Sequence, residues 1–147
     1  DRWKRLFPGT TRVKKDTEVT DQDLQQYHLI VWGDPQSNQV LARAAGKLPI
    51  QWSPEQINVG QQQFTAGSHA LVMIYPNPLQ ISKYLVINSG PTYREGHDAS
   101  NSVQTPKLPD WAVVDLSVPP DGLVPGRIAA ADFFGESWEL SKTEPGK

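Results

Sequence analysis

The chain of 147 residues contains no cysteine. This absence excludes disulfide bonds, thiolate nucleophiles and sulfur ligands for metals, but it does not identify a compartment, because many secreted and cytosolic bacterial domains lack cysteine. The chain also lacks any apolar run near the ~20 residues that a membrane-spanning helix needs. Its net charge is small, −2 at pH 7, and no basic face stands out. We therefore predict no membrane span and no nucleic-acid partner.

Sequence motifs for phosphate and metal binding are missing as well. Neither Gly-x-Gly-x-x-Gly nor Gly-x-x-x-x-Gly-Lys-[Ser/Thr] occurs, which argues against dinucleotides and nucleoside triphosphates. The histidines His28, His69 and His97 do not have the spacing of metal ligands. We therefore predict neither a metal nor another cofactor.

Turn-forming residues, in contrast, are frequent. The chain has 13 prolines and 11 glycines, which indicates many turns and short elements. Its length and its hydrophobic content of 37% are those of one soluble domain covering residues 1–147. Residues 1–9 have the pattern of the end of a linking helix, and residues 141–147 form a polar tail. Because the chain also begins with Asp rather than Met, we predict a domain excised from a longer protein.

The hydrophobic pattern predicts an α/β fold. Residues 29–32 are apolar at successive positions, so we expect residues 28–32 to form a strand at the centre of a parallel sheet. A helix is expected over residues 37–47, capped by Ser37 or Asp34, and a capping box at Thr20 predicts a second, shorter helix. Further strands are expected at 11–19, 50–52, 59–64, 70–75, 84–87, 111–116 and 127–134, the last at a sheet edge. This order favours a three-layer, Rossmann-like or flavodoxin-like sandwich with a mixed, largely parallel sheet.

Two connections between the predicted strands are short. Gly67 and Ser68 have the composition of a hairpin loop between the 59–64 and 70–75 strands. Five residues separate the Pro76–Pro78 turn from the 84–87 strand, and a parallel crossover needs a dozen or more. The 70–75 and 84–87 strands are therefore either an antiparallel pair or not neighbours.

Polar turns follow three of the predicted strands. If these strands point the same way, the turns share one edge of the sheet, where open α/β sheets bind ligands. The alternative is structural, because turns and helix caps are built from the same residue types. The candidate binding residues at these turns and just beyond them are Asp34, Ser37, Asn38, Asn77, Asn88, Ser89 and Tyr93.

A serine hydrolase site is only partly matched. Such sites usually carry Gly-x-Ser-x-Gly after a strand, and this pentapeptide does not occur in the chain. Asn88-Ser89-Gly90 after a strand matches this pentapeptide in part. A triad of Ser89, His97 and Asp110, however, would not follow the usual chain order of such enzymes. We therefore assign no catalytic residue. Trp32 and Trp111 lie in predicted strands, and we expect both in the core.

Several strings resemble one protein region closely. The chain is similar, over nearly its whole length, to a C-terminal region that follows the α/β-hydrolase domain in large bacterial proteins of the prolyl-oligopeptidase or esterase type, chiefly from planctomycete-like bacteria. In such parents the Ser-Asp-His machinery belongs to the upstream domain, and the resemblance implies a periplasmic or extracellular location. The strings that carry the resemblance are residues 12–20, 29–38, 75–79, 84–90 and 106–112.

Three hypotheses for function follow. The first is a non-catalytic accessory domain of a secreted multidomain serine hydrolase, which docks on the upstream catalytic domain or gates it. That hypothesis predicts exposed apolar anchors such as Trp3, Phe7 or Trp138. The second is a small-molecule or carbohydrate-binding module that uses the strand-end turns. The third is an independent hydrolase that uses Ser89 and His97.

Overall fold

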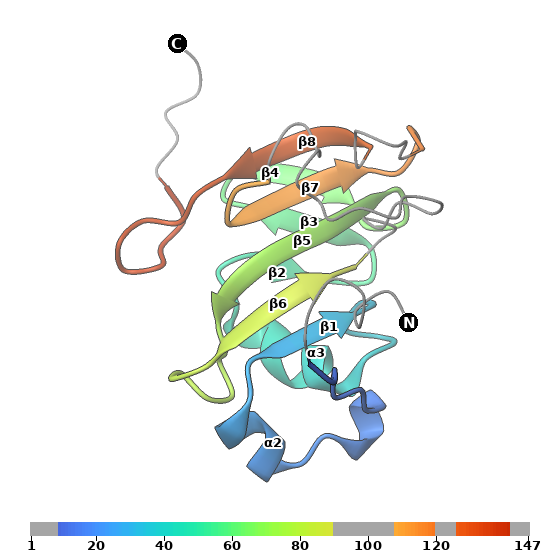
Figure 1. The fold of residues 1–147 in the computed structure, drawn as a ribbon. Helices are drawn as coiled ribbons and strands as arrows, with labels where there is room; N and C mark the ends of the chain where they lie inside the picture. Colours follow the sequence, from blue (N-terminus) through green and yellow to red (C-terminus); the bar gives the residue numbers. More distant parts are fainter. Residues whose placement is uncertain (1–8, 90–107, 120–125, 142–147) are drawn as a thin grey trace.

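A mixed five-stranded sheet is the main layer of the protein. The computed structural model describes residues 9–89, 108–119 and 126–141, and the strand order is β1-β6-β5-β7-β8. Within these ranges β1 and β6 run parallel, whereas the other three neighbouring pairs are antiparallel (Figure 1). The strands are β1 (Leu29–Trp32), β5 (His69–Pro76), β6 (Tyr84–Asn88), β7 (Trp111–Asp115) and β8 (Arg127–Asp132).

A second layer covers one face of this sheet, which we call the inner face. It consists of the helix α3 (Gln39–Ala44), the 3₁₀ turn η2 (Ala45–Lys47) and a three-stranded antiparallel sheet of β2 (Gln51–Trp52), β3 (Gln56–Val59) and β4 (Gln62–Thr65). Figure 1 shows this layer behind the large sheet. The hydrophobic core lies between the two layers, and its fully buried side chains include Leu41, Ile57, Leu71, Leu85 and Ile87.

The predicted three-layer sandwich is wrong. In the described part of the chain no helix covers the opposite, outer face of the sheet, and α2 (Asp21–Gln26) lies beyond β1, at one edge (Figure 1). Both α-helices have six residues, which is too short to cover a five-stranded sheet. The largely parallel sheet is also wrong, because short connections such as the one between β5 and β6 join antiparallel neighbours.

The first strand lies at an edge of the sheet rather than at its centre. Its neighbour on one side is β6, and of its side chains only Val31 is buried. Ile30 and Trp32 point to the outer face, with 52% and 64% of their surface exposed. The prediction of a core position is therefore wrong for Trp32 and correct for Trp111, which is buried. An apolar run does not by itself show that both faces of a strand are covered.

Three local predictions also fail. Residues 11–19 contain the 3₁₀ turn η1 (Asp16–Glu18) instead of a strand. The strand predicted over 59–64 is interrupted at Gly60, whose φ of +58° forms the turn of the β3–β4 hairpin. The turn at Gly67 connects two different sheets, since β4 and β5 do not pair.

Other local predictions are confirmed. Thr20 forms the expected capping box with Asp23 at the start of α2, β5 and β6 are an antiparallel pair, and β8 is an edge strand. The linking helix predicted at residues 1–9 and the polar tail at 141–147 lie almost entirely outside the described residues.

Candidate functional site at the strand ends

The turn after β1 is a tight hydrogen-bonded structure centred on Asp34. Its Oδ1 atom accepts from the backbone N–H of Gln36 at 3.0 Å and from the N–H and hydroxyl of Ser37, both at 2.8 Å. Burial would raise the pKa of Asp34, but the hydrogen bonds from Ser37 and Gln36 outweigh it, so the pKa lies below the ordinary value of 3.8. The carboxylate is therefore ionised and engaged within its own turn.

A glycine makes this turn possible. Gly33 has a φ of +96°, and a Cβ atom added there would meet the Ser37 Oγ at 2.6 Å. Its backbone N–H donates to the Asn88 carbonyl at 3.2 Å. The turn is thereby connected to the end of β6, and Asp34 and Asn88 come from neighbouring strand ends as predicted.

Asn38, rather than Ser37 or Asp34, caps helix α3. Its Oδ1 atom accepts from the N–H groups of Val40 and Leu41, at 2.9 and 3.1 Å, and its Nδ2 donates to the Trp32 carbonyl at 3.1 Å. The next N–H, that of Gln39, donates to an Asp16 carboxylate oxygen at 2.8 Å. Protein groups thus satisfy the start of α3, where an anionic ligand would otherwise bind.

The Ser89 side chain also has a structural partner. Its Oγ atom accepts from the backbone N–H of Leu71, and its own N–H donates to the Leu71 carbonyl at 3.0 Å. The proposed partner His97 lies outside the described residues. His69, the first residue of β5, contacts the Ser68 hydroxyl and the Thr65 carbonyl through Nδ1. Nothing in these contacts activates Ser89 as a nucleophile.

Asn77 does not join the other candidates. It follows the end of β5, and because β5 and β6 are antiparallel this end lies beside the start of β6, where Pro76 pairs with Tyr84. Asn77 is therefore at the opposite end of the strands from Asn88, and it is fully buried. The three strands do not all point the same way, so Asn77 does not share an edge with the other two turns. Tyr93 lies outside the described residues.

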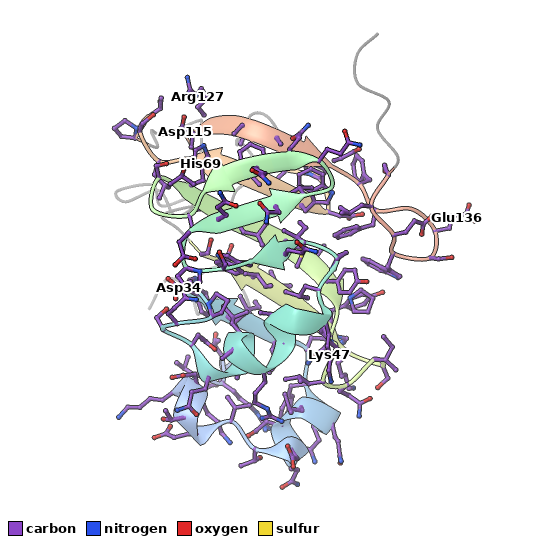
Figure 2. The ribbon with its side chains drawn as sticks, turned by 180° about the vertical axis from the view of Figure 1, so that it is seen from behind. Asp34, Lys47, His69, Asp115, Arg127 and Glu136 are labelled. Carbon is purple, nitrogen blue, oxygen red and sulfur yellow. The ribbon has the colours of Figure 1, made fainter. Side chains whose placement is uncertain are left out.

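A shallow hollow of about 160 Å³ lies where the two layers meet at the strand ends. Asp34 and Ser89 are the predicted residues that line it, together with Trp52 and His69, which the sequence did not indicate. Figure 2 shows Asp34 and His69 on the same side of the molecule. Trp52 and His69 come from different sheets, so no local sequence pattern could have joined them to the Asp34 turn.

The outer face of the large sheet carries exposed apolar side chains. Ile30 and Trp32 are exposed on β1, and register places Val86 beside Ile30 on the same face. At the other edge Phe133, directly after β8, is 62% exposed. Exposed apolar side chains that gather on one face often mark an interaction site, so the part of this face around β1 is a candidate interaction surface.

Comparison of the chain with protein-family models, with curated proteins and with solved structures finds no match. Among the described residues there is no group of three or more His, Cys, Asp or Glu side chains placed to hold a metal ion. In the same part of the chain no helix is long and apolar enough to cross a membrane.

Proposed function

We propose that this chain is a non-catalytic docking domain. The observation that carries the proposal is the exposure of Trp32, 64%, on a strand edge beside the exposed Ile30. Tryptophan supplies a large rigid apolar area, and it is enriched among the residues that dominate binding energy in protein interfaces. The outer face around Trp32 is thus the contact surface.

The proposed partner is the α/β-hydrolase domain that the resemblance places upstream in the same polypeptide. Two domains of one polypeptide are held close together, so their association does not need electrostatic steering. A contact of this kind is consistent with an apolar face on a chain of low net charge. The parent protein would be a secreted serine hydrolase that acts in the periplasm or outside the cell. This domain would support or gate the catalytic domain rather than supply reacting groups.

The other two hypotheses have less support. Independent hydrolysis needs an activated Ser89, whose Oγ instead accepts a backbone hydrogen bond. A ligand site at the strand-end turns would use a hollow of about 160 Å³. Asp34 and Asn38, its best candidates, are engaged in the turn and the helix cap.

The test is a binding measurement between this chain and the hydrolase domain encoded with it. We expect Trp32→Ser to weaken association at least tenfold by calorimetry, because the substitution removes the central apolar contact. Val13→Ser is the matched control, since Val13 is exposed and lies outside the sheet; it should leave association unchanged. A natural polypeptide without a hydrolase domain would contradict the proposal, and so would hydrolysis of esters or peptides by this chain alone.

A further inference from the structure

A second hollow lies at the other end of the large sheet, beside the loop between β5 and β6. Its volume is about 230 Å³, and its lining combines aromatic, apolar and polar side chains. Figure 2 shows Glu136, in the loop that carries Trp138, on the opposite side of the molecule from Asp34. The lining residues are Pro76, Ile81, Ser82, Lys83, Tyr84 and Trp138.

Tilted and edge-on contacts between rings hold the aromatic wall of this hollow in place. The Trp138 ring lies 5.6 Å from Tyr84, 5.9 Å from Tyr75 and 6.0 Å from Phe134, centroid to centroid. Tyr84 also stacks on His28 at 5.5 Å, and the backbone N–H of Tyr84 donates to His28 Nδ1 at 2.8 Å. The rings of Tyr84 and Trp138 are therefore fixed before any ligand arrives.

Trp138 has a strained backbone. Its φ of +64° makes it the one residue other than glycine with positive φ in the part of the chain that the structure describes. A bulky side chain is strained in this conformation, which persists where surrounding contacts enforce it, often at ligand-binding positions. Here a tight turn from Gly135 and the three neighbouring rings keep the indole at the wall of the hollow.

The polar rim of the hollow is equally fixed. Asn77 donates its N–H to the Lys83 carbonyl at 2.7 Å and accepts from the Leu79 N–H through Oδ1 at 3.0 Å, which closes the loop. Ser82 donates its hydroxyl to Gln80 at 3.3 Å, so its oxygen is still able to accept. Lys83 is half-buried and forms no ion pair with any described residue.

We propose that this hollow binds one pyranose ring that carries a carboxylate, as in a hexuronic acid. The apolar C–H face of the sugar would pack on Trp138 and Tyr84, a sugar hydroxyl would donate to Ser82, and the carboxylate would pair with the Lys83 ammonium. A hollow below the roughly 300 Å³ of the smallest common ligand pockets suits a single ring. Tyr84 lies at the opposite end of β6 from Asn88, which pairs with Trp32, so either proposal can fail without the other.

The experiment titrates the 147-residue chain with glucuronate and galacturonate, and separately with their neutral counterparts glucose and galactose. Calorimetry and ligand-observed NMR measure the binding. We expect saturable binding of an acid at least tenfold tighter than that of its neutral counterpart. Lys83→Gln should remove this preference and leave the weaker neutral binding. Lys15→Gln, at an exposed lysine that does not line the hollow, is the control for charge and should change neither affinity.

The aromatic wall is tested with a matched pair of variants. Tyr84→Phe keeps the ring and should retain binding, whereas Tyr84→Ala should weaken the binding of acid and neutral sugars by tenfold or more. Circular dichroism of both variants checks that they are folded. The assignment is overturned if no sugar binds saturably at millimolar concentration, or if acids and neutral sugars bind with equal affinity. It is also overturned if Lys83→Gln leaves binding unchanged, or if a proline-rich peptide binds this hollow in preference to the sugars.

Discussion

The structure ties the ionisation of Asp23 directly to folding. Its carboxylate accepts from the Lys14 ammonium at 2.7 Å and from the N–H and hydroxyl of Thr20, both at 2.8 Å. The Lys14 hydrogen bond is the largest of the influences that lower the pKa of Asp23 from 3.8 to about 2. The ionised form is thus favoured in the folded state, where it completes the cap of α2.

This shift predicts a loss of stability in acid. Because the pKa of Asp23 is lower in the folded state, the contribution is fully present above about pH 4 and is lost as pH falls towards 2. We expect the urea midpoint of Asp23→Asn to depend less on pH in that window than the midpoint of the unmodified chain. Asp21→Asn is the control, because Asp21 is in the same helical turn but makes one exposed contact, 3.5 Å from Arg43. Equal slopes for Asp23→Asn and the unmodified chain would contradict this assignment.

For single residues of the candidate site, the sequence predicted where several polar side chains lie but not what they do. Asp34 and Ser89 do meet at one hollow, because β1 and β6 are parallel and end together. Asn77 does not, because β5 runs antiparallel to β6; the short connection after Asn77 allowed this direction but did not establish that the two strands pair. Trp52 and His69 join the hollow through the contact between two sheets, which a local pattern cannot predict.

Among the elements, α3 depends on its cap more than on its length. A helix of six residues has little intrinsic stability, so packing and capping must hold it. Asn38 both caps its first turn and connects it to the end of β1.

We therefore expect Asn38→Ala to lower the free energy of unfolding by about 1–2 kcal/mol. Asn38→Ser retains an acceptor for the helix N–H groups but loses the Nδ2 bond to Trp32, so its effect should be smaller. Gln36→Ala, an exposed side chain in the same turn, is the control and should change stability by less than about 0.5 kcal/mol. Urea denaturation measures all three, and an Asn38→Ala variant as stable as Gln36→Ala would disprove the capping role.

Element types were more predictable than their arrangement. The strands near 84–87 and 111–116 are short apolar runs bounded by turn residues, and both exist close to the predicted limits. The run at residues 29–32 looks the same, yet it forms an edge strand with one face open. Strand order and direction result from pairing between distant segments, so an apolar run alone cannot distinguish a central strand from an edge strand.

For the whole molecule, the hydrophobic core lies mainly on the inner face of the sheet, although Ala112 and Val114 of β7, which face outward, are also buried. The inner face packs against α3 and the small sheet, and the outer face presents Ile30 and Trp32 to solvent. This asymmetry is tested by making the same isoleucine-to-alanine substitution on each of two paired strands. Ile87 on β6 is fully buried on the inner face, and Ile30 on β1 is 52% exposed on the outer face.

Ile87→Ala should cost about 2–5 kcal/mol of unfolding free energy, because it removes buried methylene groups and leaves a cavity between the layers. Ile30→Ala should cost less than about 1 kcal/mol, since water already reaches most of that side chain. Urea denaturation of the isolated chain measures both. A large loss for Ile30→Ala would mean that the outer face is part of the core of this chain, and Trp32 would then be a structural residue rather than a docking residue. A small loss, together with weaker binding of the hydrolase domain by the same variant, would assign the outer face to association.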